Sequence, residues 1–227
     1  MGKKSISLVV FLLMVLTVMS QEKQRSGGDS KVRFGLTASP LISWMKSDNK
    51  DIERGKIRAG VEYGLLMDYF FKQNYGISTG VTVSLLGGNL LYADTTLFAL
   101  DTKARFKMQY LNVPLVLKLR TNEIGYFTYY GQFGLVPSFR FRARLDATQN
   151  GVELYENENF IKGNPFFDSN FFNLSLNVGG GFEYSISGRT ALQVGVYYNN
   201  GFINVMDDRD NDRVQVNHVV LRTAIFF

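Results

Sequence analysis

Residues able to carry acid–base or metal chemistry are few in this chain of 227 residues. There is no cysteine, so thiolate nucleophiles, thiolate metal sites and disulfides are all excluded. His218 is the single histidine, which excludes histidine clusters and paired-histidine proton relays. A serine–histidine–acid triad would need His218 beside a serine at a rim, whereas its alternating position directs it inward. The sequence therefore indicates a protein that is not an enzyme and holds no cofactor.

One loop has the spacing of a calcium site. Asp208, Asp210 and Asp212 recur at every second position, like the start of a calcium-binding loop. The match then fails, because Arg213 stands where glycine is needed and Val219 where the bidentate glutamate is needed. We interpret the segment as a solvated acidic loop, with weak divalent-cation bridging to surface lipid as the alternative. Three glutamates of an earlier loop have the same interpretation: Glu153, Glu156 and Glu158.

The glycine run 179–181 lies within an alternating segment and lacks the helix that a phosphate-binding loop requires. We expect it to permit sharp curvature or close packing inside the fold.

Two long segments alternate between apolar and polar residues. In 57–71 the odd positions are apolar or aromatic, while the even positions carry three charges and two glycines. Segment 172–187 shows the same contrast in the opposite parity. A strand places successive side chains on opposite faces, and these segments far exceed the five or six residues of a typical strand. The pattern predicts strands with one face toward lipid and one toward a barrel interior.

Six further segments alternate in the same way and bring the expected number of strands to eight: 32–40, 77–85, 109–119, 127–141, 192–198 and 219–227. Short connections near 72–74, 121–123 and 187–189 are rich in turn residues. The other links are longer: 43–56, 87–103, 142–170 and 200–212. This predicts an all-β, eight-stranded antiparallel up-and-down transmembrane β-barrel with short periplasmic turns and long extracellular loops. With an even number of strands, both termini lie in the periplasm of a bacterial outer membrane.

Charges of both signs fall on positions expected to face the interior. An eight-stranded barrel has room inside for side chains and little more, and an unpaired buried charge is costly. We therefore expect a lumen plugged by paired charges, with a proton or ion path through them as the alternative. This structural polar network comprises Arg58, Glu62, Asp68, Lys118, Arg140, Glu183, His218 and Arg222, with Arg33 on the same face.

The first residues differ from the rest of the chain. Lys3 and Lys4 precede the apolar run 6–18, which is followed by a small residue, Ser20. These are the parts of a secretory signal peptide, and the run is short of the roughly 20 residues that a membrane-spanning helix needs. We expect 1–20 to be the signal peptide, 21–30 a short periplasmic segment and 31–227 the outer-membrane barrel.

The bulk composition agrees with this organisation. The hydrophobic fraction is 45% and the mean hydropathy is −0.05, as expected where only every second residue faces lipid. The net charge of +5 is too mild and too scattered to indicate a nucleic-acid partner.

Several motifs resemble a known family. The segment 109–115, QYLNVPL, resembles the Y-[LI]-x-[IV]-P-L strand of the PorT-like outer-membrane β-barrel family (outer membrane protein beta-barrel domain). The segments 125–134, 33–36 and 60–64 are also similar, and the resemblance covers 31–227. It implies an eight-stranded barrel, and the namesake of the family is a component of the type IX secretion apparatus. The end of the chain resembles the assembly signal read by barrel insertion machinery, through Leu221, Ile225 and Phe227.

We therefore expect a non-enzymatic structural or surface-interaction protein of the envelope. One alternative is an accessory component of a type IX secretion system, with its subunits as partners. Another is a small-solute transporter. The partners expected in every case are outer-membrane lipid and, during insertion, the barrel assembly machinery.

Overall fold

The computed structural model describes residues 31–47, 52–92, 102–149, 152–159, 168–207 and 213–227. The expected signal peptide 1–20, the segment 21–30 and the aspartates at 208, 210 and 212 lie outside these ranges. Residues Lys31–Phe227 form one compact unit. Within the described ranges, no helix is long and apolar enough to cross a membrane.

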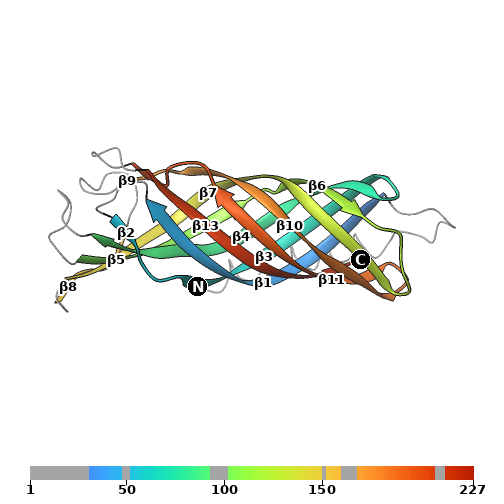
Figure 1. The fold of residues 1–227 in the computed structure, drawn as a ribbon, viewed down its shortest axis with the longest axis horizontal. Helices are drawn as coiled ribbons and strands as arrows, with labels where there is room; N and C mark the ends of the chain where they lie inside the picture. The colour runs from blue at the N-terminus through green and yellow to red at the C-terminus, as the bar shows by residue number, and fades with distance from the viewer. Residues whose placement is uncertain (1–30, 48–51, 93–101, 150–151, 160–167, 208–212) are drawn as a thin grey trace, which may run out of the picture. The chain divides into compact units, whose positions relative to one another are not determined.

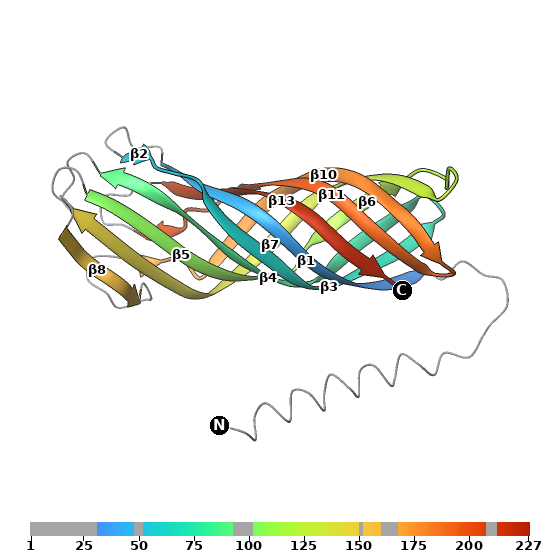
Figure 2. The same cartoon turned by 90° about the horizontal axis from the view of Figure 1, so that it is seen from below.

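The compact unit is a ring of eight antiparallel strand positions (Figures 1 and 2). Around the ring lie β1 (Val32–Ser47), β3 (Arg58–Lys72), β4 (Tyr75–Tyr92), β5 (Thr102–Asn112) with β6 (Leu115–Arg120), β7 (Phe127–Gln149), β10 (Phe172–Ser187), β11 (Thr190–Gly201) and β13 (Val214–Phe226). The first and last strands close the ring, with Leu36 opposite Ile225 and Ser43 opposite His218. The predicted eight-stranded antiparallel barrel is confirmed.

One predicted strand is interrupted. The segment 109–119 was expected to be continuous, but Val113 and Pro114 separate β5 from β6. Pro114 has no amide hydrogen to donate to a neighbouring strand, so the ladder breaks at that point. The preceding amide remains bonded, because Val113 N donates to Pro137 O at 2.9 Å.

Short turns join the strands at one end of the barrel, at 73–74, 121–126 and 188–189. Gly125 (φ 67°) and Gly188 (φ 55°) adopt left-handed backbone in two of these turns, a conformation that favours glycine. The start of β1 and the end of β13 lie at the same end, since Phe34 and Phe227 exchange backbone hydrogen bonds of 3.3 and 2.9 Å. This is the end that the outer-membrane pattern assigns to the periplasm.

At the opposite, loop end the strands run further than expected. β1 continues to Ser47, β4 to Tyr92 and β7 to Gln149, into segments predicted as loops. Four short strands add to this end. β2 (Ile52–Arg54) pairs with β4, and β8 (Val152–Asn159) pairs with β7, while β9 (Asp168–Ser169) and β12 (Met206–Asp207) pair with each other. Figure 1 shows β8 beyond the main ring. The backbone of β8 therefore carries the three glutamates that the sequence indicated.

A bulge in β7 changes which residues face outward. Tyr110 of β5 lies opposite Arg140 and Gln109 lies opposite Arg142, so Phe141 is the extra residue. Before the bulge the even positions of β7 are buried, as at Arg140. After it the odd positions are buried, as at Leu145, and Arg142 becomes exposed. Arginines of β7 therefore face both sides of the wall.

Candidate functional site

Four charged residues close the interior of the barrel near its short-turn end. Arg33 Nη2 lies 2.9 Å from Asp68 Oδ2 and 2.9 Å from Glu183 Oε1. Lys118 Nζ lies 2.7 Å from each of the same two oxygens. Each acid thus binds both bases, and we call Arg33, Asp68, Lys118 and Glu183 the charge square. Its members come from β1, β3, β6 and β10, so it links distant walls of the ring.

Lys118 is the best satisfied member of the charge square. Its side chain is 1% exposed, which makes its desolvation costly. Besides the two carboxylates, Nζ donates to Gln193 Oε1 at 2.8 Å, so all three ammonium hydrogens have acceptors. Nζ also lies 4.6 Å from the ring centre of Tyr130 and 5.0 Å from that of Phe226. Such contacts favour a buried cation.

Aromatic rings close the short-turn side of the charge square. Arg33 Cζ lies 5.0 Å from the ring centre of Phe70 and 4.9 Å from that of Phe226. Both phenylalanines are buried, so they separate the charges from the barrel mouth.

A tyrosine pair lies above the charge square. Gln193 Nε2 donates to Tyr197 Oη at 3.0 Å, and the hydroxyls of Tyr130 and Tyr197 are 2.6 Å apart. Glycines make room for these rings: a Cβ at Gly179 would lie 2.5 Å from Tyr197 Cδ1, and one at Gly195 would lie 2.3 Å from Tyr130 Oη. The glycine run of β10 thus permits close approach of large side chains.

A second ion pair lies in the interior next to the tyrosine pair. Arg222 Nη2 is 3.1 Å from Glu62 Oε1, and Ser84 Oγ donates to Glu62 Oε2 at 2.9 Å. Asn112 Nδ2 continues the network to Ser84 Oγ at 2.6 Å. The guanidinium of Arg222 also lies over the ring of Tyr197, 4.2 Å from its centre. The ion pair is therefore linked to the tyrosines.

The loop end of the interior is apolar instead of polar. Phe106 and Met45 are fully buried there, and Leu90 packs in the same cluster. This apolar layer comprises Leu41, Met45, Leu86, Leu90, Ala104, Phe106, Met108, Tyr110, Ala143, Leu145, Ala147, Val205, Val214, Val216 and Val220, with Tyr130 and Tyr197 at its boundary. The lumen is thus filled in two ways, by charges near the turns and by hydrocarbon near the loops.

The remaining residues of the predicted network lie apart from the charge square. Arg140 is buried and its Nε donates to the Asn170 carbonyl at 3.3 Å, beside the start of β10. His218 is buried on β13, and no described residue bonds its Nδ1 atom.

Arg58 was expected in the network, and this expectation was wrong. Its side chain is half-buried, and Nη1 donates to the Phe106 carbonyl at 3.3 Å, on the neighbouring wall. The pairing of β3 with β4 starts at Glu62, so residues 58–61 at the loop end of β3 are not paired with β4. This gap lets the Arg58 side chain reach across β4.

The three residues of the expected assembly signal all face outward. Leu221 and Ile225 are exposed on β13 and Phe227 is exposed directly after its end, whereas the intervening Phe226 is fully buried. An apolar stripe on the last strand is therefore available at the barrel wall.

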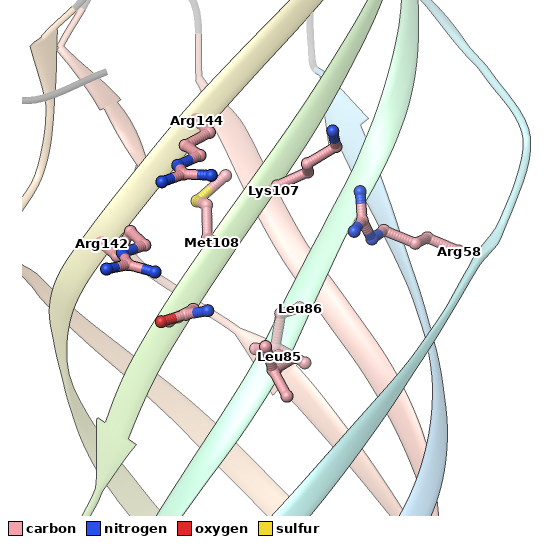
Figure 3. Close-up of a pocket in the computed structure, with 8 residues that line it drawn as sticks. Arg58, Leu85, Leu86, Lys107, Met108, Arg142 and Arg144 are labelled. Atoms are coloured by element: carbon pink, nitrogen blue, oxygen red, sulfur yellow. The ribbon is translucent and has the colours of Figure 1, made fainter. Parts of the chain in front are cut away.

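The wall also carries a cleft that sequence reasoning missed. It has a volume of about 130 Å³. Its cationic side chains come from three strands of the wall, β3, β5 and β7, as Figure 3 shows. This basic cleft is lined by Arg58, Leu85, Leu86, Lys107, Met108, Gln109, Arg142 and Arg144. The signal is present in 103–109 and 142–148, where charged residues alternate with apolar ones, but the predicted strands begin at 109 and end at 141 and so leave out nearly all of both segments.

The described part of the chain holds no cluster of three or more histidine, cysteine, aspartate or glutamate residues able to bind a metal ion.

An antiparallel ring of eight strands, apolar outside and filled inside, defines a transmembrane β-barrel of the bacterial outer membrane. The chain belongs to the outer membrane protein beta-barrel domain family, which matches residues 19–207. This is the broad barrel family, so the narrower PorT-like assignment stays a prediction. No curated protein matches the chain by sequence.

Solved structures with similar folds include small outer-membrane barrels. OprG of Pseudomonas aeruginosa has a TM-score of 0.52 at 12% identity, with 90% of this chain and 99% of that chain covered. Neisserial surface protein A gives 0.47 at 13% identity, covering 88% and 98%. Ail, the attachment invasion locus protein of Yersinia pestis, gives 0.40 at 17% identity, covering 87% and 100%. The likeness to OprG shows a shared fold.

Proposed function

We propose that this protein is a closed, non-enzymatic barrel that acts as a structural or surface-interaction protein of the outer membrane. The observation that carries the proposal is the doubly filled lumen: the charge square lies near the turns and the apolar layer lies near the loops. An ion crossing the barrel would have to break four short ion pairs and then enter hydrocarbon, where a bare charge is very costly.

Conductance in planar lipid bilayers tests this proposal. The full chain, purified from outer membranes, should give no steady channels in concentrated KCl. The positive control is the double variant Lys118→Ala/Phe106→Ala, which truncates one large side chain in the charge square and one in the apolar layer. If this variant still folds, it should give leak currents. Regular conductance steps from the unchanged protein would overturn the closed-lumen proposal and favour a small-solute transporter.

Contacts with other molecules then belong to the outer wall and the loop end. The strands extend furthest at the loop end, where β8 pairs with β7 and β9 pairs with β12. These additional paired strands give the loop end a larger ordered surface than short turns would give.

The role as a type IX secretion accessory rests on the family resemblance alone. Brief crosslinking of native outer membranes, followed by purification in mild detergent, tests it. Recovery of secretion subunits in amounts comparable to the barrel would favour that role. Recovery of the barrel with lipid alone would favour the surface protein.

A further inference from the structure

The basic cleft concentrates positive charge on the outer face of the wall. Lys107 and Arg144 are direct cross-strand partners, an arrangement of like charges that destabilises a sheet. Arg142 follows on the same face, and Arg58 enters from β3. Asp146 neutralises Lys107 at 2.5 Å, and the cleft lining itself contains no acidic residue. The excess cations would be stabilised by an external anion.

One of these arginines has an unused hydrogen-bond donor. Arg144 Nε is inaccessible to solvent and has no hydrogen-bond partner among the described residues. The covered Nε atom is out of reach of a ligand, so an anion in the cleft would meet the terminal nitrogens of the Arg144 guanidinium. Phosphate oxygens suit arginine especially well, because the planar guanidinium can donate two parallel hydrogen bonds.

The cleft lies where the outer wall changes from apolar to charged. On β7 the exposed Phe141 immediately precedes Arg142, and on β5 the exposed Leu111 gives way to Gln109 and then Lys107. An apolar outward face indicates contact with acyl chains, so its edge marks the level of the headgroups. Leu85, which is partly exposed on the outer wall, lies beside the cations, whereas the other apolar lining residues, Leu86 and Met108, are buried in the apolar layer. A soluble anion would need no apolar wall.

We propose that the basic cleft binds the phosphate-bearing headgroup of an anionic outer-leaflet lipid. The guanidinium groups of Arg142 and Arg144 hold the phosphate, Arg58 adds positive charge, and the adjoining apolar wall packs against the start of the acyl chains. Basic pockets at a membrane surface recognise anionic headgroups by this combination of charge and hydrogen bonding.

Native mass spectrometry of the full chain in mild detergent tests the proposal. The probe is bis-phosphorylated lipid A, titrated onto delipidated protein. The double variant R142Q/R144Q removes the two guanidinium groups, and K72Q/R189Q removes the same charge from exposed positions at the short-turn end. We expect R142Q/R144Q to bind the lipid at least about tenfold more weakly, and K72Q/R189Q to bind it as the unchanged protein does. Heat-modifiable gel mobility verifies that each variant is folded.

Two further probes test whether binding depends on the phosphates of the lipid and whether a soluble anion can replace the lipid. Dephosphorylated lipid A should bind weakly to every form of the protein, and inorganic pyrophosphate at equal concentration should not displace the intact lipid. Equal lipid binding by R142Q/R144Q and the unchanged protein would overturn the proposal. Complete displacement by pyrophosphate would overturn the lipid assignment, because the cleft would then be a site for soluble anions.

Discussion

Asp68 and Glu183 come from β3 and β10, four steps apart in the ring of eight strands, yet their carboxylates bind the same two cations. Lys118 Nζ lies 2.7 Å from each of them. Two acids and two bases leave the charge square with no net charge, which limits the cost of burying it. The square therefore joins opposite walls of the barrel through side chains alone.

Removing the ammonium group from the charge square should strongly destabilise the barrel. In Lys118→Met, Asp68 and Glu183 would share a single arginine, and the free energy of unfolding should fall by about 3–5 kcal/mol. Urea unfolding in detergent micelles, followed by the fluorescence of Trp44, measures this loss. Lys72→Met, at an exposed position, should change the unfolding free energy by less than about 0.5 kcal/mol. Equal stability of the two variants would contradict a structural role for the square.

The ion pair between Glu62 and Arg222 should couple more strongly than an exposed pair. A double-mutant cycle with Glu62→Gln and Arg222→Gln should give a coupling energy of about 1–3 kcal/mol, because both side chains are buried. The pair Lys107–Asp146 is partly exposed and should give less than about 1 kcal/mol in a parallel cycle. Similar coupling in both cycles would show that burial does not strengthen the inner pair.

The tyrosine pair should make Gly195 intolerant of a side chain. A Cβ there would lie 2.3 Å from Tyr130 Oη, so Gly195→Ala should cost about 1–3 kcal/mol of unfolding free energy. Tyr130→Phe removes the clashing oxygen together with its 2.6 Å bond to Tyr197. The double variant should lose less stability than the sum of the single losses. Strict additivity would place the strain elsewhere, such as at the Gly180 carbonyl.

The short-turn half of the barrel could be predicted from the sequence. There the odd positions of β3 are apolar and the even positions carry Glu62 and Asp68, so parity and polarity together identify the two faces. Burial follows that assignment for Asp68, Lys118 and Glu183. The alternation of odd and even positions shows which side chains face inward but not which of them meet. The contacts among the four residues of the charge square could therefore be seen only in the structure.

The loop half was misread because the polarity of its two faces is reversed. In 103–110 charged residues alternate with Ala104, Phe106 and Met108, and the apolar set faces inward, as in a water-soluble barrel. The prediction takes the apolar face to be the outer one throughout, so it begins this strand only at 109 and leaves 104–108 out of it. The bulge at Phe141 then shifts the phase of β7, and the opening beside β3 lets Arg58 leave its expected face. Neither feature has a signal in residue alternation.

The apolar layer should contribute as much to stability as the charged one. Phe106 is fully buried within it, so Phe106→Ala should leave a cavity and lower the unfolding free energy by about 3–5 kcal/mol. Phe141→Ala is the matched control: this ring is 52% exposed on the outer wall, and its loss should cost less than half as much. Urea unfolding in detergent micelles of one composition compares the two variants. A larger effect at Phe141 would mean that contact with lipid or detergent, and not the inner packing, stabilises the loop end. A larger effect at Phe106 would show that the buried apolar layer stabilises the loop end, as the proposal of a closed lumen requires.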